Sequence, residues 1–265
     1  MPDIPFTPAR VTPASAGNAS PEYPHDAPLR LPEAQWRALC EAYAHPPRAY
    51  HHIGHVFDTL ARFRDVANGP GWRRPAEVWA ALLYHDAIYE AGRKDNERRS
   101  AELALAHFAR WPAQLRAAPS ADPPDVEQGA ASSAPLAAFE PHRVAELIQL
   151  TARHGALDRA AVAAAIANAA DLDGPDLEGP DLDDTLHMLD ADMAILGADP
   201  ATFAEYDRAI AEEYRGHVPG FLYRRGRKAF FRGLLARERI YLSDFFHARR
   251  EAQARANLEA ALHAR

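Results

Sequence analysis

Cysteine is almost absent from this 265-residue chain, in which Cys40 stands alone. A single cysteine cannot form an internal disulfide, and it cannot by itself supply a cysteine-rich zinc site. Any metal ion bound by this chain would therefore be held by histidine, aspartate and glutamate side chains.

Long hydrophobic runs are also missing. No stretch of the sequence approaches the length of about 18 uninterrupted apolar residues that marks a membrane-spanning helix. The first residues, MPDIPFTPARV, lack the basic start and apolar segment of a secretory signal. We therefore expect a soluble, cytoplasmic protein without a membrane partner.

Positive charge is in the minority, because 30 Lys and Arg face 37 Asp and Glu, for a net charge of -7. This balance disfavours binding to a polyanionic nucleic acid. Residues 224–250 are locally basic, but their aromatic residues recur at helical spacings, which favours core packing with arginines that reach the solvent. We expect no nucleic-acid partner, and nothing in the sequence indicates an oligomeric state.

Hydrophobic residues make up 48% of the chain, enough for a packed core. Residues 1–30 are rich in Pro, Ala and Ser and show no periodicity, which predicts a disordered N-terminal arm. Residues 31–265 form the expected helical domain. Loop insertions are expected near 113–140, where prolines and small residues gather, and near 171–183, which holds a repeat of Asp, Leu, Gly and Pro.

Helical periodicity runs through most of the domain. Trp36, Leu39, Cys40 and Tyr43 follow the i, i+3, i+4, i+7 spacing of one helix face. Similar patterns predict helices over 51–66, 75–89, 96–109, 144–154, 158–170 and 184–196, one more from about 199, and two within 219–265. Alternating β-branched runs do not persist anywhere, so we predict an all-α bundle of about nine or ten helices.

Several histidines and aspartates occupy positions where the helical pattern calls for apolar residues. His55 shares a face with apolar residues, Asp86 lies seven residues after Trp79, and His85 flanks it. His154 lies three residues after Thr151, and Asp192 lies three after Leu189. Burial of such groups costs several kcal/mol unless they are paired or bind a metal, so we expect them to converge.

A mixed set of imidazoles and carboxylates suits a divalent ion such as Mn, Fe, Co, Ni or Zn better than calcium. Adjacent helical residues diverge by about 100°, so His85 and Asp86 can reach one ion only near the end of a helix. The stretch from Tyr84 to Glu90, followed by Gly92, has the character of such an end. Helical phase alone leaves Asp190 open as an alternative to Asp192.

The ordered motifs resemble a known family. They are YHHIGH (50–55), YHDAIYE (84–90), DNERRSAELA (95–104), LTARHG (150–155), LDADMAILGADP (189–200) and ARANL (254–258). Together they resemble the HD-domain superfamily of metal-dependent phosphohydrolases, in a bacterial branch described as predicted HD-superfamily phosphohydrolases. The resemblance covers roughly residues 31–260.

This resemblance implies a helical bundle that holds one divalent ion (Mn, Co, Ni, Fe, Zn or Mg) through His55, His85, Asp86 and Asp192. It favours Asp192 over Asp190, because the last ligand of the family stands in an A-D-x-x-x-L context. Some members bind a second ion through two further histidines. His154 is placed like one of them, but the other position carries Asn96 and Glu97, so one ion is expected.

The implied reaction is hydrolysis of a phosphate ester in a nucleotide or another small phosphorylated metabolite by a metal-activated water. Asp86 would orient or deprotonate that water, and Glu97 would serve as general base or leaving-group acid. The expected substrate-binding residues are His51, His52, Arg93, Lys94, Arg98 and His154. Two alternatives are a di-iron HD-type oxygenase and a non-catalytic, nucleotide-responsive binding module.

Overall fold

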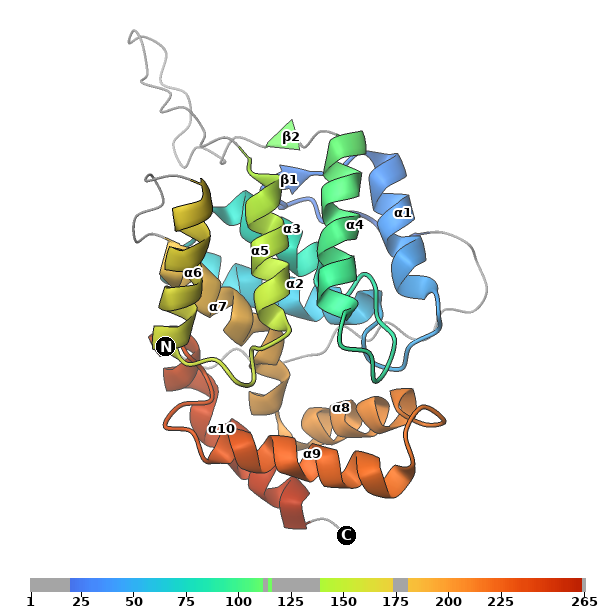
Figure 1. Ribbon diagram of the computed structural model, residues 1–265, viewed down its shortest axis with the longest axis vertical. Coiled ribbons are helices and arrows are strands. Elements are labelled where there is room, and N and C mark those ends of the chain that lie inside the picture. The colour runs from blue at the N-terminus through green and yellow to red at the C-terminus, as the bar shows by residue number, and fades with distance from the viewer. Residues whose placement is uncertain (1–19, 112–113, 116–138, 174–180, 264–265) are drawn as a thin grey trace, which may run out of the picture.

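The computed structural model describes residues 20–111, 114–115, 139–173 and 181–263, and this part of the chain is helical (Figure 1). Its α-helices are α1 Glu33–Ala44, α2 Ile53–Ala67, α3 Pro75–Tyr84, α4 Asn96–Arg110, α5 Pro141–Thr151, α6 Arg159–Asp173, α7 Asp181–Met193, α8 Pro200–Glu213, α9 Gly220–Leu235 and α10 Asp244–His263. A short 3₁₀ helix, η1 (Ala194–Gly197), follows α7. The predicted all-α bundle of about ten helices is confirmed.

The helix boundaries follow from local sequence signals. Pro75, Pro141 and Pro200 each lie in the first turn of a helix, where the missing N–H of proline costs nothing. Asp199 caps α8 by accepting bonds of 3.1 Å from the backbone N–H groups of Ala201 and Thr202. The main difference is at α3, which ends at Tyr84 rather than near residue 89.

The larger part of the core surrounds α3. All residues of this helix after Pro75 are buried, because α2, α4, α5 and α7 pack around it. Trp79 is fully buried and meets Phe63 of α2 edge to face, with ring centroids 5.0 Å apart. Because neighbouring helices hold α3 on every side, the position of its C-terminal end is fixed. The His85–Asp86 pair follows directly after this end and is therefore fixed as well.

A second hydrophobic cluster joins η1 to α8, α9 and α10 at the lower end of the molecule (Figure 1). The Asn257 side chain on α10 donates bonds of 2.8 Å to the carbonyls of Leu196 and Ala198. Gly197 is required here, since an added Cβ would lie 2.8 Å from the backbone oxygen of Arg250. These contacts fix the end of α7 and the start of α8.

The packed part of the chain begins earlier than expected. Residues 1–19 of the predicted arm lie outside the described part, but Ala27 and Leu29 are buried. The Tyr23 hydroxyl donates to the carbonyl of Leu29 at 2.6 Å, and β1 (Leu29–Arg30) pairs antiparallel with β2 (Gln114–Leu115). The boundary at residue 30 is therefore corrected to about residue 20.

The two predicted insertions lie largely outside the described residues. Only 114–115 and 139–140 of the segment 113–140 are described, and residues 174–180 of the segment 171–183 are not. Helix α6 continues to Asp173 and α7 begins at Asp181, so helices occupy both ends of the second segment.

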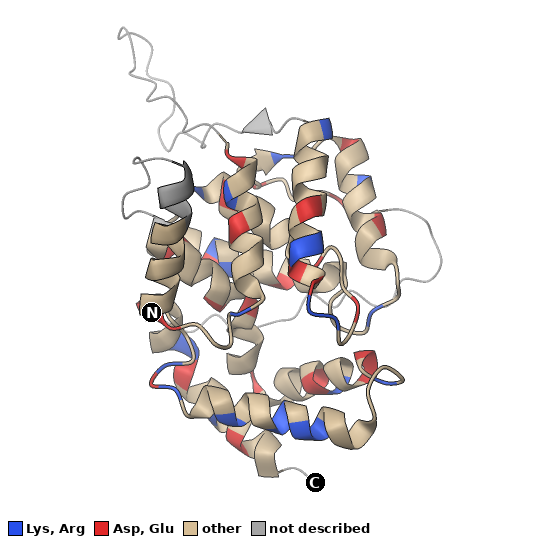
Figure 2. Cartoon of the chain, viewed as in Figure 1, with Lys and Arg blue, Asp and Glu red and all other residues tan. Residues whose placement is uncertain are grey.

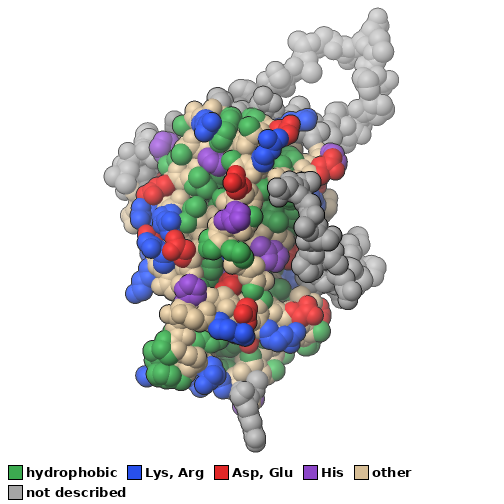
Figure 3. Space-filling view, turned by 90° about the vertical axis from the view of Figure 1, so that its right-hand side faces the viewer, with side chains coloured by type: hydrophobic (Ala, Val, Ile, Leu, Met, Phe, Trp, Pro, Cys, Tyr) green, Lys and Arg blue, Asp and Glu red, His purple; other side chains and the backbone are tan. Residues whose placement is uncertain are grey.

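Charged residues of both signs occur along many of the described helices. Basic residues line α9, while acidic and basic residues alternate along α4 (Figure 2). The face drawn in Figure 3 shows the two signs intermixed, with histidines between them. Within the described residues, no helix combines the length and apolar character needed to cross a membrane.

Candidate metal centre

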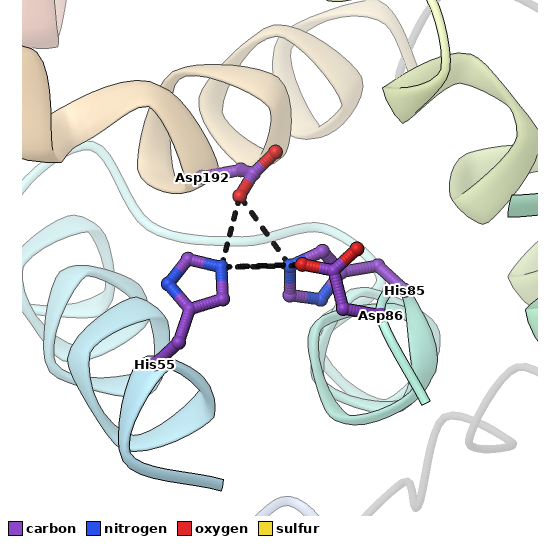
Figure 4. Close-up of side chains that lie close together, drawn as sticks. All are labelled: His55, His85, Asp86 and Asp192. Atoms are coloured by element: carbon purple, nitrogen blue, oxygen red, sulfur yellow. Dashed lines mark hydrogen bonds and ion pairs between the residues drawn. The ribbon is translucent and has the colours of Figure 1, made fainter. Parts of the chain in front are cut away.

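Four side chains from three separate regions of the chain meet in the interior (Figure 4). His55 comes from the first turn of α2, His85 and Asp86 follow the end of α3, and Asp192 lies in the last turn of α7. The ligand atoms that they offer all lie within 4.8 Å of one another. This group could hold a metal ion.

The distances within the group fit a single ion. The Nε2 atoms of His55 and His85 are 3.1 Å apart, and they lie 3.2 and 3.3 Å from Oδ1 of Asp192. Oδ2 of Asp86 lies 3.5 Å from His55 Nε2 and 3.2 Å from His85 Nε2. With metal–ligand bonds of about 2.1 Å, neighbouring ligands are about 3.0 Å apart in octahedral and about 3.4 Å apart in tetrahedral coordination. The observed separations match these values.

The backbone of α3 sets the orientation of one imidazole. His85 is the C-cap residue of this helix, and its Nδ1 lies 2.9 Å from the carbonyl oxygen of Leu82. Nδ1 donates to this carbonyl, so in the neutral ring the lone pair of Nε2 faces the other three ligands. A helix end thus supplies both the position and the tautomer that a metal ligand needs.

An arginine that sequence reasoning missed holds the His85–Asp86 turn in place. Arg48 donates from Nη1 to the carbonyl of Asp86 at 2.6 Å and from Nη2 to the carbonyl of Ala87 at 2.9 Å. The same side chain donates to the carbonyls of Ala42 and His51, both at 2.9 Å. Arg48 therefore ties the α1–α2 connection to the turn that carries two ligands.

Burial and mutual charge shift the pKa values of the group. Burial alone would lower the pKa of His85, but the carboxylates of Asp86 and Asp192 outweigh it and raise this pKa well above 6.5. Burial would raise the pKa of Asp192, but the neighbouring imidazoles of His154 and His85 hold it well below 3.8. Without a metal, protonated histidine is therefore the counter-charge of the two carboxylates.

The structure distinguishes the two aspartates that the sequence left open. Asp190 faces away from the group and accepts bonds from the backbone N–H groups of Leu242 and Ser243, at 2.8 and 2.7 Å. Its Oδ2 also accepts a bond of 2.6 Å from the Ser243 hydroxyl. Asp190 thus fixes the start of α10, while Asp192 belongs to the candidate metal centre.

His154, Glu97 and His51 border the same site. Nδ1 of His154 lies 2.8 Å from Oδ2 of Asp192, although His154 is in the turn after α5 rather than within the expected helix. His51 Nδ1 lies 2.6 Å from a carboxylate oxygen of Glu213, which also accepts from the backbone N–H of His51 at 2.9 Å. Glu213, at the end of α8, is a second residue that sequence reasoning missed.

The remaining predicted substrate-binding residues lie elsewhere. His52 caps α2 by accepting a bond of 2.9 Å from the Gly54 N–H. Arg93 and Arg98 are paired with Asp95 at 2.8 and 3.1 Å, and Lys94 is exposed. These four side chains do not line the cavity beside the metal centre. Asp95 engages Arg93 and Arg98 at the surface, where Lys94 is also exposed.

A cavity of about 460 Å³ opens beside the four ligands. Asp86, Asp192, His51, His154 and Glu97 line one side of it. Residues of α8 and α9 that sequence reasoning did not assign to the site line the other, among them Tyr206, Tyr223, Arg227 and Phe230. The volume falls in the range of about 300–1,000 Å³ that is typical of small-molecule sites.

Comparisons with protein-family models, with curated proteins and with solved structures find no match to this chain. The resemblance to the HD-domain superfamily therefore stays a prediction that the quoted motifs carry. The geometry of the site is an independent observation, since it rests on the positions of the side chains.

Proposed function

We propose that this protein is a metal-dependent phosphohydrolase that cleaves a phosphate ester of a small metabolite. The observation that carries the proposal is the arrangement of two imidazole nitrogens and two carboxylate oxygens at one side of a ligand-sized cavity. The two nitrogens lie 3.1 Å apart, and each lies 3.2 to 3.5 Å from both carboxylate oxygens. An ion held there would polarise a phosphoryl oxygen and lower the pKa of a bound water.

Hydrolysis breaks the bond between phosphorus and the ester oxygen and forms a bond from phosphorus to the oxygen of water. The water loses a proton, and the leaving alcohol gains one. Asp86 and Glu97 both line the cavity and are the candidates for accepting the proton from water. Once protonated, Glu97 could return a proton to the leaving oxygen.

Two imidazoles at the rim supply hydrogen-bond donors for the phosphate. Burial would lower the pKa of His154, but the carboxylate of Asp192 raises it above its usual value. Nδ1 of His154 faces Asp192, which leaves Nε2 as the ring atom available to a ligand. The Nδ1 atom of His51 is engaged by Glu213, which leaves Nε2 as the ring atom available to a ligand. Charge-assisted donors of this kind suit phosphoryl oxygens.

The test combines activity with matched variants. Phosphate release from a panel of phosphate esters is measured with Mn²⁺, Co²⁺, Ni²⁺ and Mg²⁺ for the wild type, His85→Ala and Asp86→Asn. We expect both variants to lose turnover by at least about 100-fold while far-ultraviolet circular dichroism stays unchanged. His187→Ala is the control, because His187 is also a buried histidine but contacts Trp72 and Phe245.

Three results would contradict the proposal. Turnover that survives in both variants would place the chemistry elsewhere. Two irons per chain with oxygen consumption would favour an oxygenase. Tight nucleotide binding without turnover under every ion would favour a binding module.

A further inference from the structure

The wall of the cavity formed by α8 and α9 carries three aromatic rings beside aliphatic residues. Tyr206 of α8 and Tyr223 and Phe230 of α9 line it. Tyr206 meets Tyr50 edge to face, with ring centroids 4.7 Å apart, and Tyr223 lies 5.3 Å from Tyr214. Aromatic faces of this kind stack with flat rings of almost any identity.

Two buried polar atoms in this wall lack a hydrogen-bond partner among the described residues. They are the Tyr223 hydroxyl oxygen and Nη2 of Arg227. The rest of the Arg227 side chain is engaged, because Nε lies 2.9 Å from Asp207 and the guanidinium lies over the ring of Tyr206, 4.9 Å from its centroid. Buried polar groups are rarely left unpaired, so both atoms mark places where a ligand could supply the partner.

The charge of the wall limits the ligand. Among the described residues that line the cavity, Arg227 is the one Arg or Lys, and its charge is balanced by Asp207. The carboxylates of Asp86, Asp192 and Glu97 line the same space. A di- or triphosphate chain needs several cations for its additional negative charges, and this wall does not provide them.

We infer that the cavity takes a phosphomonoester whose alcohol carries a flat ring system, such as a nucleobase or an aryl group. The phosphate lies at the metal centre, and the ring lies against Tyr206, Tyr223 and Phe230. Arg227 and the Tyr223 hydroxyl contact polar atoms at the edge of the ring. This inference rests on the proposed function and specifies its substrate class.

The experiment measures binding and turnover separately. Calorimetry with Mn²⁺ present determines the Kd of the non-hydrolysable phosphonate analogues of a nucleoside 5′-monophosphate, the matching 5′-triphosphate and glycerol phosphate. Phosphate release from the parent compounds gives kcat/KM. The variants are Tyr223→Ala, Tyr223→Phe and, as a matched control, Phe221→Ala, because Phe221 lies on the same helix but is 65% exposed and does not line the cavity.

We expect the monophosphate to bind at least about tenfold more tightly than either other compound. Tyr223→Ala should weaken this binding by about tenfold, Tyr223→Phe by less, and Phe221→Ala not at all, while glycerol phosphate is insensitive to all three changes. Equal or tighter binding of the triphosphate would overturn the inference, as would equal effects of Tyr223→Ala and Phe221→Ala. If every ester resists hydrolysis while the binding pattern holds, the proposed reaction fails and the ligand class stands.

Discussion

Asp190 and Asp192 lie two residues apart on α7, yet their environments predict opposite consequences of substitution. Asp190 accepts hydrogen bonds from two backbone N–H groups and one hydroxyl at the start of α10, and it is 2% exposed. Removal of the carboxylate leaves these donors buried without an acceptor, at a cost of about 1–3 kcal/mol for each donor. We therefore expect Asp190→Ala to lower the free energy of unfolding by about 3–5 kcal/mol.

Asp192 has the converse role. Its oxygens face His55, His85 and His154, and among the described residues no backbone N–H group is bonded to it. Asp192→Ala should therefore change the free energy of unfolding of the metal-free protein by less than Asp190→Ala does. Substitution of a residue that only hydrogen-bonds to a metal ligand typically weakens metal affinity by about 10–100-fold. Loss of Asp192, which is itself a ligand, should therefore weaken metal affinity further.

The assay is chemical denaturation of the metal-free proteins, followed by Mn²⁺ titration of those that fold. Asp190→Asn is included because it keeps one carbonyl acceptor and should fold even where Asp190→Ala does not. We expect Asp190→Asn to bind Mn²⁺ like the wild type and Asp192→Ala to bind it at least about 100-fold more weakly. Equal stability losses in the two alanine variants, or equal losses of Mn²⁺ affinity, would refute the assignment.

Three further predictions follow from the same contacts. With the free metal at 100 times its Kd, bound metal should stabilise the wild type by about 2.7 kcal/mol, so chelation should lower the Tm of the wild type and leave that of His85→Ala unchanged. Scanning calorimetry measures both Tm values, and equal shifts in the two proteins would contradict the prediction. In the metal-free protein the pKa of His85 is raised above 6.5, whereas the unfolded chain keeps the ordinary value. The charge on His85 therefore stabilises the folded protein fully below pH 6.5, and this contribution is lost as pH rises through the higher folded-state pKa. The Tm of the protein in chelator should therefore fall, rather than rise, as pH increases from 6.5 through that folded-state pKa. Arg48→Met should lower the free energy of unfolding, measured by urea titration, by about 2–4 kcal/mol and weaken Mn²⁺ binding about tenfold. The control Arg37→Met removes an exposed pair with Glu33 and should change the free energy of unfolding by less than about 1 kcal/mol.

The sequence predicted those features that depend on short-range periodicity. Helices around Leu60, Trp79 and Leu147 appear where apolar residues recur at helical spacing, and His55 and Asp192 point inward because they share those faces. The apolar pattern predicted that His55, Asp86, His154 and Asp192 face the interior. The resemblance to the HD-domain superfamily narrowed the expected ligands to His55, His85, Asp86 and Asp192, which the structure brings together.

The features that were not predicted depend on contacts between distant segments. Arg48 and Glu213 act through hydrogen bonds to backbone groups, which no side-chain spacing reveals. The packing of Tyr23 and Leu29 likewise depends on a partner strand far along the chain. The prediction of core packing for the aromatic residues of α9 is confirmed for Phe231 and not for Phe230, which lines the cavity. A helical stripe looks the same in sequence whether it faces a core or a cavity.

Neighbouring carboxylates engage two of the basic residues predicted to bind substrate. Arg93 and Arg98 stand beside the predicted ligands in the sequence, which suggested a phosphate clamp. In the structure Asp95 pairs with both of them, and Glu102 also pairs with Arg98. Sequence proximity to a site therefore does not place a side chain in it when a nearer carboxylate is available.

The central claim is that His55, His85, Asp86 and Asp192 share one ion, and Mn²⁺ titration of the metal-free protein by isothermal calorimetry tests it most directly. The predicted result is one Mn²⁺ per chain in the wild type and in His187→Ala, with binding lost in His55→Ala and in His85→Ala. The same affinity in His55→Ala and His85→Ala as in the wild type would contradict the claim.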